Sequence, residues 1–571
     1  MRDVTAGPLL IFGPRSTTYD FGPSHPLTPR RFGPALDLLR TVGAVVGRAP
    51  EPVEDAELLS VHTARYIAAV RRLSANPRGD PEAGLAAFGD DPPFAGMHAA
   101  AAAVAGGSLR AVAVIVSGEV EHAYHPGGGL HHAMPGRASG FCIYNDPALA
   151  IAAARRAGLR VLYIDLDVHH GDGVQAIHLD DPGVLTFSIH ESGRTLFPGS
   201  GFVDELGEGA AAGTSVNLPL EAGTGEAAWL AGVSDLVPAL AAAFGPDLIV
   251  SQHGADSHAW DPLAHLLVTT TAMDAAARLV DRVAHRVAGG RWLATGGGGY
   301  DVYRVVPRTW ALTWLAAAHQ DAPETTDPGW QARWAAAAAA YGQGPPPLTF
   351  RDLPNAGMAV SDRQRQAEAR SLETLAEVRA ISLPRLLVVA QERGWWDPLS
   401  SAAGGPVEAP PVDGVPAIMA NLGPEVVERL VVDRRVLPPA DPRAARQLLL
   451  AALRDGARAS GAVVGEHLVG VAVSAAGPDS GGAVELLWVG VAPAHRRQGV
   501  ASALLAAALG AQPADQVHGP WTARIGVAER DVVEPLPLDE RFAIAGRLYD
   551  KAGFMALEGR SSGLARRFIR G

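Results

Sequence analysis

The sequence predicts an α/β protein with a mostly parallel sheet and helices on both faces, followed by a smaller α+β domain. Three apolar runs, which begin near Val161, Pro246 and Arg291, each lead into polar or glycine-rich residues. Several strands with polar ends, separated by alanine-rich segments, are typical of βα units in a parallel sheet. Because open α/β sheets bind ligands beyond the carboxyl ends of their strands, we expect the functional site at those ends.

The central segment of the chain is VLYIDLDVHHGDG, from Val161 to Gly173. Apolar and aromatic residues lead into an alternation in which Asp165, Asp167 and His169 occupy every second position. This period predicts a buried strand whose last residues place carboxylate and imidazole groups on one face. Because carboxylates are seldom buried without a partner, we expect this segment to carry function.

The other elements of the first domain are predicted from local composition. Apolar residues predict a short first strand over 9–12, and VLTFSIH predicts another strand that begins at Val184. Alanine-rich segments predict helices after the acidic turn within 89–111 and over 148–157 and 334–341. These helices would cover the two faces of the sheet.

The length of the chain, 571 residues, predicts more than one domain, because a single core usually stops growing at about 250–300 residues. Residues 397–416 are rich in Pro, Gly, Ser and Ala and show no apolar period, which predicts a linker. The expected organisation is a first domain over 1–396, this linker, and a second domain over 417–571.

The composition limits the classes of partner. There are 48 Lys and Arg residues against 60 Asp and Glu residues, so the formal net charge is −12 and nucleic acid is not an expected partner. We find no uninterrupted apolar run of the roughly 20 residues that a bilayer requires, and no secretory signal at the N-terminus. Cys142, the single cysteine, excludes an internal disulfide. These observations predict a cytoplasmic protein with no membrane partner.

Asp167, His169 and Asp256 offer a possible metal site. Asp256 follows another apolar strand, and two carboxylates with one imidazole leave room for water, as in catalytic zinc sites. The same ligands also suit Fe²⁺. Such an ion can lower the pKa of bound water from 15.7 toward about 7, so hydrolysis is the expected class of reaction.

Further polar residues can supply the proton transfers of an amide hydrolysis. His131 and His132 lie side by side in a glycine-rich loop, and they can act as base and acid. Asp165 and Asp172 are carboxylates that can each orient one imidazole. Tyr300 follows four glycines, which leave room for its phenol to approach the metal and stabilise an oxyanion.

These motifs resemble those of the arginase-like histone deacetylase family, and specifically its bacterial acetoin-utilisation branch. The matching segments are HHA, GFCIYND, DLDVHHGDG, SIH, LFPGSG, QHGADSH and GGGGY, in this order over residues 131–300. The resemblance covers about residues 8–395. It implies that Asp167, His169 and Asp256 bind the metal, Zn²⁺ or Fe²⁺. It also implies that His132 is the general base, His131 its electrostatic partner or the general acid, Asp165 and Asp172 their supports, and Tyr300 the oxyanion donor.

The resemblance further implies a narrow tunnel for an acyl-lysine side chain. Phe141 and Phe197 would form its walls, and Asp90 would hold the substrate backbone at the rim, with Asp91 as the alternative. Arg31 matches an arginine below the pocket that is associated with acetate exit.

The second domain contains a segment that resembles the GNAT acetyltransferases. LLWVGVAPAHRRQGVASALLAAAL leads from a strand into a helix, and amides at a helix N-terminus bind pyrophosphate well. Together with LYDKAGF over 548–554, it implies acetyl-CoA binding over about residues 417–571. Glu485 would deprotonate the acceptor amine and Tyr549 would protonate the thiolate. The residues expected at the cofactor are Val491, Arg496, Arg497, Gln498, Gly499, Val500, Ala501 and Ser502.

The expected function is metal-dependent hydrolysis of acetyl-lysine on proteins, with release of acetate, by a chain that also carries an acetyl-CoA-binding acetyltransferase domain. The resemblance makes acetyl-CoA synthetase the candidate target protein. Two alternatives stay open: an acetylpolyamine amidohydrolase, and a deacetylase gated by a GNAT module that senses acetyl-CoA without transferring it. Phe542 stands where the GNAT family usually has Asn, which is the reason for the second alternative.

Overall fold

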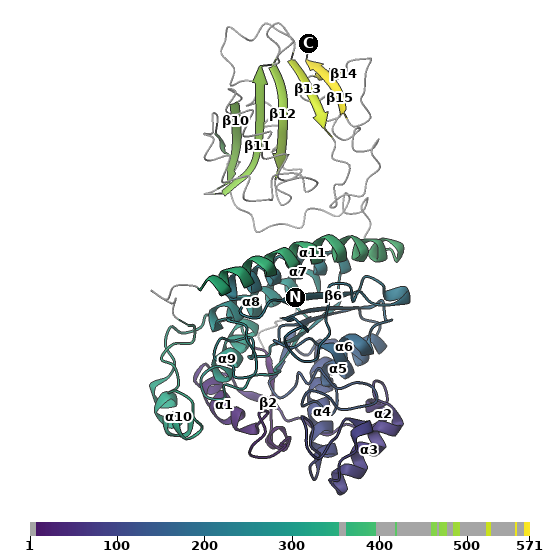
Figure 1. Ribbon diagram of the computed structural model, residues 1–571, viewed down its shortest axis with the longest axis vertical. Coiled ribbons are helices and arrows are strands. Elements are labelled where there is room, and N and C mark those ends of the chain that lie inside the picture. Colours follow the sequence, from purple (N-terminus) through teal and green to yellow (C-terminus); the bar gives the residue numbers. More distant parts are fainter. Residues whose placement is uncertain are drawn as a thin grey trace. The chain divides into compact units, whose positions relative to one another are not determined.

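The computed structural model divides the chain into two compact units, Met1–Asp397 and Pro398–Gly571. The structure describes residues 7–352 and 361–395 of the first unit and the strand backbones of the second (Figure 1). The proposed linker over 397–416 lies outside the described residues.

The first unit is built on an eight-stranded sheet in the order β2-β1-β3-β8-β7-β4-β5-β6, and every neighbouring pair is parallel. The mostly parallel sheet predicted from the sequence is therefore confirmed. Its strands are β1 (Leu9–Ile11), β2 (Val46–Arg48), β3 (His122–His125), β4 (Val161–Asp165), β5 (Val184–Glu191), β6 (Ser215–Leu220), β7 (Leu248–Gln252) and β8 (Trp292–Thr295).

Helices cover both faces of this sheet. They are α1 (Phe32–Thr41), α2 (Asp55–Leu58), α3 (Ala64–Ala75), α4 (Met97–Val116), α5 (Asp146–Arg156), α6 (Asp172–Ile177), α7 (Glu226–Phe244), α8 (Thr270–Val287), α9 (Val306–Ala317), α10 (Pro328–Ala340) and α11 (Asp362–Glu392). Several begin at side chains that accept a hydrogen bond from the first turn, such as Thr63 before α3, Asn145 before α5 and Thr269 before α8.

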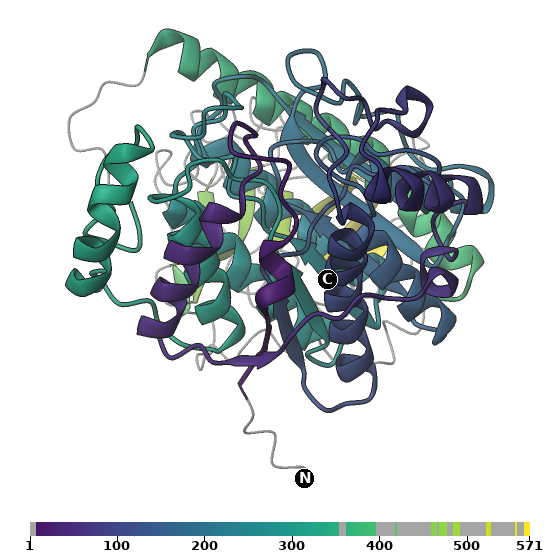
Figure 2. The same cartoon turned by 90° about the horizontal axis from the view of Figure 1, so that it is seen from below.

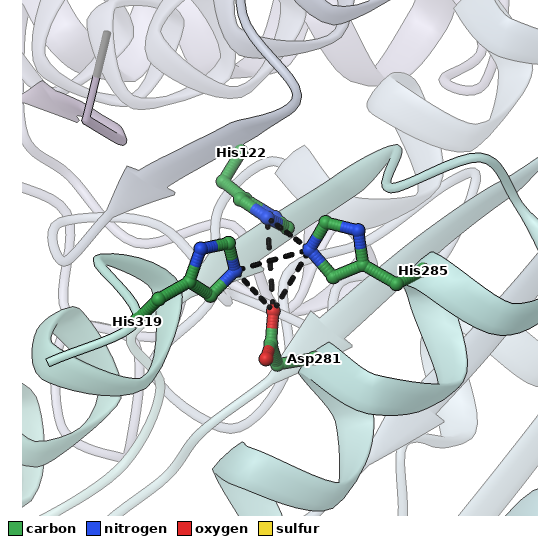
Figure 3. Close-up of side chains that lie close together, drawn as sticks. All are labelled: His122, Asp281, His285 and His319. Carbon is green, nitrogen blue, oxygen red and sulfur yellow. Dashed lines mark hydrogen bonds and ion pairs between the residues drawn. The ribbon is translucent and has the colours of Figure 1, made fainter. Parts of the chain in front are cut away.

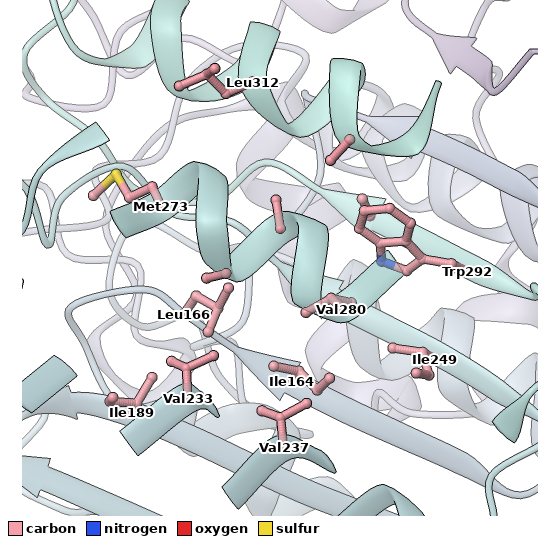
Figure 4. Close-up of a cluster of buried hydrophobic side chains, with 14 of the residues drawn as sticks. Ile164, Leu166, Ile189, Val233, Val237, Ile249, Met273, Val280, Trp292 and Leu312 are labelled. Atoms are coloured by element: carbon pink, nitrogen blue, oxygen red, sulfur yellow. The ribbon is translucent and has the colours of Figure 1, made fainter. Parts of the chain in front are cut away.

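The period-two pattern of β4 explains why both faces are covered. Leu162 and Ile164 join the core formed with α1, α7, α8 and α9, while Val161 and Tyr163 join the core formed with α4 and α5. Figure 4 shows the first of these cores, where Ile164 lies with Val237 of α7. Burying one aliphatic side chain stabilises the fold by about 1.5–3 kcal/mol. The helix layers on the two faces therefore hold β4, and the loop that follows it, in position.

The N-terminal helix α1 lies beside helices that come late in the chain (Figure 2). Trp330 of α10 is fully buried and donates its indole N–H to the backbone oxygen of Pro34 in α1, at 2.8 Å. This hydrogen bond joins the beginning and the end of the first unit, because the two residues are almost 300 positions apart in the sequence.

Within the described residues, two helices, α4 and α7, are long and apolar enough to cross a membrane by length and composition. Most of the residues concerned are buried inside the protein, 72% in α4 and 56% in α7. Core helices of water-soluble proteins have the same length and composition, so this feature is explained by packing against the sheet.

The second unit contains a seven-stranded mixed sheet in the order β14-β15-β13-β12-β11-β10-β9. Among the described strands of this unit, β12 and β13 pair in parallel and the other neighbouring pairs are antiparallel. Glu485 and Val491 lie in β12, while Tyr549 and residues 496–502 lie outside the described residues. The strands are β9 (Ala417–Met419), β10 (Arg458–Val464), β11 (His467–Ala476), β12 (Val484–Val491), β13 (Trp521–Gly526), β14 (Phe554–Ala556) and β15 (Ala565–Arg570).

Candidate active site

Several predicted site residues of the first unit lie in loops that leave one edge of the sheet. β3, β8, β7 and β4 are consecutive neighbours in the sheet, and the loops after their carboxyl ends carry the residues of interest. His131 follows β3, Tyr300 follows β8, Asp256 follows β7, and Asp167 follows β4. Because the strands are parallel, these side chains converge beyond the same edge.

The strand predicted through His169 ends earlier than expected. β4 stops at Asp165, so Asp167 and His169 lie in the following loop and not on a strand face. Oδ1 of Asp165 accepts a hydrogen bond from the amide of Asp167, and Oδ1 of Asp167 accepts one from the amide of His169, at 3.2 and 3.0 Å. Aspartates that bind amides two residues ahead form turns, which here replace the strand ladder.

Asp167, His169 and Asp256 form one buried cluster of possible metal ligands. Nδ1 of His169 lies 3.0 Å from Oδ1 of Asp167 and 3.3 Å from Oδ2 of Asp256. Oδ2 of Asp256 is buried and makes no well-directed hydrogen bond among the described residues, although it forms an ion pair with His169. A buried carboxylate oxygen without such a bond is costly, and a cation bound between these atoms would compensate it.

The protonation of His169 depends on these two carboxylates. Burial alone lowers the pKa of the imidazole, but hydrogen bonds and charges from Asp167 and Asp256 outweigh burial and raise that pKa to about 10. A metal ion would take the place of this proton, because a ligand histidine must present a free lone pair.

The backbone approaches this cluster closely at a glycine. The amide of Gly298 donates to Oδ2 of Asp167 at 2.8 Å, and Gln252 donates to the same oxygen at 2.6 Å. A Cβ at position 298 would lie 1.9 Å from Oδ2 of Asp256, so no other residue fits there without displacing a carboxylate. Gly298, one of the four consecutive glycines, is therefore required because the backbone packs closely against Asp167 and Asp256.

His131 and His132 point their imidazole tips toward each other, with the two Nε2 atoms 2.9 Å apart. Each ring is held from behind by one of the predicted carboxylates. Nδ1 of His131 lies 2.7 Å from Asp165, and Nδ1 of His132 lies 2.7 Å from Asp172, the first residue of α6. The structure therefore brings together two separate carboxylate–imidazole pairs.

The two imidazoles differ in protonation. Burial lowers the pKa of His131, but the charges of Asp165 and Asp167 outweigh it and raise the pKa to about 9. Burial and the neighbouring charge of His131 lower the pKa of His132 to about 4. At neutral pH, His131 is therefore the charged ring and His132 the neutral ring with a lone pair to accept a proton.

Three residues that the sequence analysis did not assign hold this pair. The Tyr163 hydroxyl donates to Oδ2 of Asp165 at 2.7 Å, and the Asn145 amide donates to the backbone oxygen of His131 at 2.9 Å. Asp146 accepts hydrogen bonds from the amides of Gly129 and Leu130. Tyr163 could have been found from its position two residues before Asp165 on one strand, which places both side chains on the same face.

Tyr300 is buried and lines the same cavity. Burial, together with Asp256 and Asp167, raises the pKa of its phenol well above the usual range, so the hydroxyl stays protonated and can donate. The backbone amide of Tyr300 donates to Asp261 at 2.8 Å. Asp261 was not predicted, because its role is visible only once the loops after β7 and β8 are placed together.

A cavity with an empty volume of about 260 Å³ joins these groups. Its lining residues are Leu27, Gly129, Leu130, His131, His132, Gly140, Phe141, Cys142, Asp167, Gly297, Gly298 and Tyr300. The Phe141 ring lies 5.9 Å from Tyr300, and the Phe197 ring lies 5.1 Å from His132 and is partly exposed. Phe141 therefore lines the cavity beside Tyr300, whereas Phe197 contacts His132 and is not among the lining residues.

The two aspartates predicted at the rim lie in different environments. Asp90 is exposed, and its backbone oxygen lies 2.9 Å from Nε2 of His25. Asp91, the alternative, is buried, and burial raises the pKa of its carboxyl to about 8. Asp91 is therefore not a rim residue, because its side chain turns inward at the Pro-containing turn.

Arg31 lies next to the glycine-rich segment that precedes Tyr300. It is buried, donates to the backbone oxygen of Gly297 at 2.7 Å, and lies over the Trp310 ring at 5.2 Å. It lines a second cavity, with an empty volume of about 280 Å³, that shares Leu27 and Leu130 with the first. The buried guanidinium therefore lines a cavity that adjoins the first one.

The fold and this arrangement of residues define an amide hydrolase of the deacetylase type. Residues 25–317 match the histone deacetylase domain family, and residues 428–516 match the acetyltransferase (GNAT) family. The chain belongs to the histone deacetylase family, in an arrangement like that of its acetoin-utilisation members, and it carries a GNAT domain toward its C-terminus.

Individual relatives support this assignment. The acetoin utilization protein AcuC of Bacillus subtilis (strain 168) is 45% identical over 332 residues, which are 57% of this chain and 86% of that protein. AcuC of Staphylococcus xylosus is 38% identical over 323 residues, 55% of this chain and 84% of that protein. The crystal structure of an HDAC homolog complexed with SAHA covers 64% of this chain and 100% of its own, with a TM-score of 0.56 and 26% identity.

Proposed function

We propose that the first domain hydrolyses acetyl-lysine amides on proteins and releases acetate. The observation that carries the proposal is the pair of imidazoles, each backed by its own carboxylate, beside the buried Asp167, His169 and Asp256 cluster. A base, an acid and a site for a Lewis acid within one cavity are what hydrolysis of an unactivated amide requires.

Asp167, His169 and Asp256 would hold the divalent ion, Zn²⁺ or Fe²⁺. Two carboxylates and one imidazole leave open positions, as catalytic sites do. When bound, such an ion polarises the amide carbonyl and makes water a stronger acid. The buried Oδ2 of Asp256 supports this assignment, since it makes no hydrogen bond within the described residues and faces the His169 imidazole at 3.3 Å.

The proton transfers follow from the two pKa values. Neutral His132 would accept the proton of the attacking water at Nε2, while Asp172 stabilises the resulting imidazolium from Nδ1. Charged His131 would stabilise the developing negative charge and supply a proton to the lysine amine as the C–N bond breaks. The Tyr300 hydroxyl would donate a hydrogen bond to the oxyanion.

The shape of the cavity supports an extended substrate side chain. Phe141 and Phe197 would pack against the apolar lysine stem, and exposed Asp90 would accept hydrogen bonds from the substrate backbone. SAHA, which is bound by the related HDAC homolog, is expected to bind this cavity as well. Arg31 would assist the departure of acetate through the adjoining cavity.

For the physiological target we propose acetyl-CoA synthetase, in the cytoplasm, with the GNAT domain binding acetyl-CoA and acetylating the same class of protein. The support is the similarity to acetoin utilization proteins and the presence of both domain families in one chain. Tyr300→Phe in the chromosomal gene, which leaves the GNAT domain unchanged, should raise acetylation of the synthetase. An acetylation level that does not respond to this substitution would exclude this target.

The first experiment measures acetate release by the metal-loaded full-length protein from an acetyl-lysine peptide and from acetylspermidine. Turnover of the peptide that falls by about 10²-fold or more in Tyr300→Phe would support the proposed function, because one oxyanion donor is worth that much. Tyr303→Phe is the matched control, since Tyr303 packs against Trp334 outside the cavity. Turnover of acetylspermidine alone would instead identify an acetylpolyamine amidohydrolase.

A second experiment addresses the GNAT domain. Transfer of acetyl groups from labelled acetyl-CoA to a protein amine, reduced in Glu485→Gln and Tyr549→Phe, would support acetyltransferase activity. Binding of acetyl-CoA without transfer, with a change in the deacetylation rate, would support the sensing module.

A further inference from the structure

Four metal-ligating side chains meet at the opposite edge of the sheet from the cavity. They are His122, Asp281, His285 and His319 (Figure 3). His122 is the first residue of β3, whereas the catalytic loop leaves the other end of that strand. Asp281 and His285 lie one turn apart on α8, and His319 follows α9.

The spacing of these four side chains matches a tetrahedral ion site. Nε2 of His285 lies 3.1 Å from Nε2 of His122 and 3.0 Å from Nε2 of His319. Oδ1 of Asp281 lies 3.6, 3.5 and 3.1 Å from the same nitrogens of His122, His285 and His319. Zinc–ligand bonds of about 2.0–2.2 Å require separations of about 3.3–3.6 Å between tetrahedral ligands, close to those observed.

Hydrogen bonds alone do not satisfy this cluster. An imidazole nitrogen carries either one proton or one lone pair, so Nε2 of His285 can make a linear hydrogen bond with only one of its two histidine neighbours. Protonation of all three rings would place like charges about 3 Å apart. A cation at the centre would use the three nitrogen lone pairs and the Asp281 oxygen at the same time.

The surrounding backbone also favours positive charge. His285 lies in the last turn of α8, and His319 lies just beyond the end of α9, so the negative ends of two helix dipoles are nearby. His319 has a φ of +54°, a left-handed position that helix ends usually give to glycine. The fold thus accepts a costly backbone conformation that directs this imidazole toward the other three groups.

The cluster is buried at one end and open to solvent at the other. The side chain of His122 is only 5% exposed. The side chains of His285 and His319 are 39% and 52% exposed, which gives an ion a path from solvent.

We propose that His122, Asp281, His285 and His319 bind a structural zinc ion, separate from the metal of the catalytic cavity. Four protein ligands leave no open position, which is the property of structural and not catalytic zinc sites. The ion would join the amino end of β3 to the ends of α8 and α9. This proposal does not depend on the proposed function.

The test counts metal ions in the full-length protein. Chelator-stripped protein is reloaded with Zn²⁺ alone, dialysed, and analysed for zinc per chain by mass spectrometry. We expect two ions in the wild type and one in the double variant His285→Ala/His319→Ala. We expect one ion also in Asp167→Ala/His169→Ala, because the second site remains intact.

These variants distinguish a failure of the structural zinc site from a failure of the proposed catalytic metal site. If the catalytic cluster binds no zinc, the wild type would hold a single ion that is still lost in the His285/His319 variant. His265→Ala, at an exposed histidine outside the cluster, is the matched control and should retain all zinc. The proposal is overturned if the Asp167/His169 variant holds no zinc, or if the His285/His319 variant holds as much as the wild type.

Stability gives a second readout. In the Asp167→Ala/His169→Ala background, excess Zn²⁺ should raise Tm by about 5 °C or more, since an ion that binds only the folded state stabilises it. Adding His285→Ala and His319→Ala should abolish this shift. An unchanged shift would contradict a site at these residues.

Discussion

The Nε2 atoms of His131 and His132 lie 2.9 Å apart, yet the pKa values of the two rings move in opposite directions, to about 9 and about 4. Both rings are buried and each faces one carboxylate. They differ because Asp165 and Asp167 both act on His131, whereas His132 is also exposed to the charge of His131. The proton on His131 lowers the pKa of His132 and keeps that ring neutral. One ring of the pair can therefore act as an acid and the other as a base.

We predict that Asp165→Asn reduces deacetylation by about 10- to 100-fold, as loss of a carboxylate behind a catalytic or ligand histidine commonly does. The amide keeps the size of the side chain but no longer stabilises the charged form of His131. Steady-state kinetics with the acetyl-lysine peptide measure the effect. Asp235→Asn, at an exposed ion pair with Arg379, is the control. Equal activity in the two variants would show that Asp165 does not support catalysis.

We predict that Gly298→Ala abolishes catalytic metal binding and activity. The new Cβ would lie 1.9 Å from Oδ2 of Asp256 and 3.0 Å from Oδ2 of Asp167, so a ligand carboxylate must move. Gly136→Ala is the matched control, because a Cβ there meets nothing within 4 Å. Zinc content and acetate release should both fall only in the first variant; retention of both would contradict the close packing described for this glycine.

Asp91 should make the protein less stable as the pH rises. Burial raises the pKa of its carboxyl to about 8, while in the unfolded chain it is about 3.9. Between these values the folded state binds more protons than the unfolded state, so the free energy of unfolding falls with increasing pH, by up to about 6 kcal/mol.

Asp91→Asn removes this titration and should flatten the dependence between pH 5 and 8, as urea unfolding of both proteins would show. Asp90→Asn, at the exposed neighbour, should retain most of the slope. If wild type and Asp91→Asn show the same slope, the carboxyl titrates normally.

Asp352→Ala should destabilise the first unit by about 3–5 kcal/mol. Asp352 accepts hydrogen bonds from fully buried Arg308 at 2.7 Å and pairs with His258 at 2.9 Å. Without this carboxylate the guanidinium is left as an uncompensated buried charge. The exposed pair of Asp235 and Arg379 provides the comparison, where Asp235→Ala should cost at most about 1 kcal/mol. Similar losses of stability in the two variants would refute the argument.

The sequence by itself predicted β1, β4, β5, β7 and β8 and the chemistry at the strand ends, whereas β2, β3 and β6 were not predicted. Buried parallel strands need apolar runs, and a period of two in β4 placed Leu162 and Ile164 opposite Val161 and Tyr163. The local signal failed at the end of β4, because the side chains of Asp165 and Asp167 bind the backbone and turn the chain.

Only the tertiary structure decided which distant residues meet and which carboxylates are buried. Asp90 and Asp91 are adjacent, yet only Asp91 turns inward. The cluster of His122, Asp281, His285 and His319 contains residues from β3, from α8 and from the segment after α9. In the sequence, the local indication of this cluster was the spacing of four residues between Asp281 and His285, which places both on one face of a helix. Such contacts join residues up to about 200 positions apart, so they depend on how the sheet and helices pack and not on any short segment of sequence.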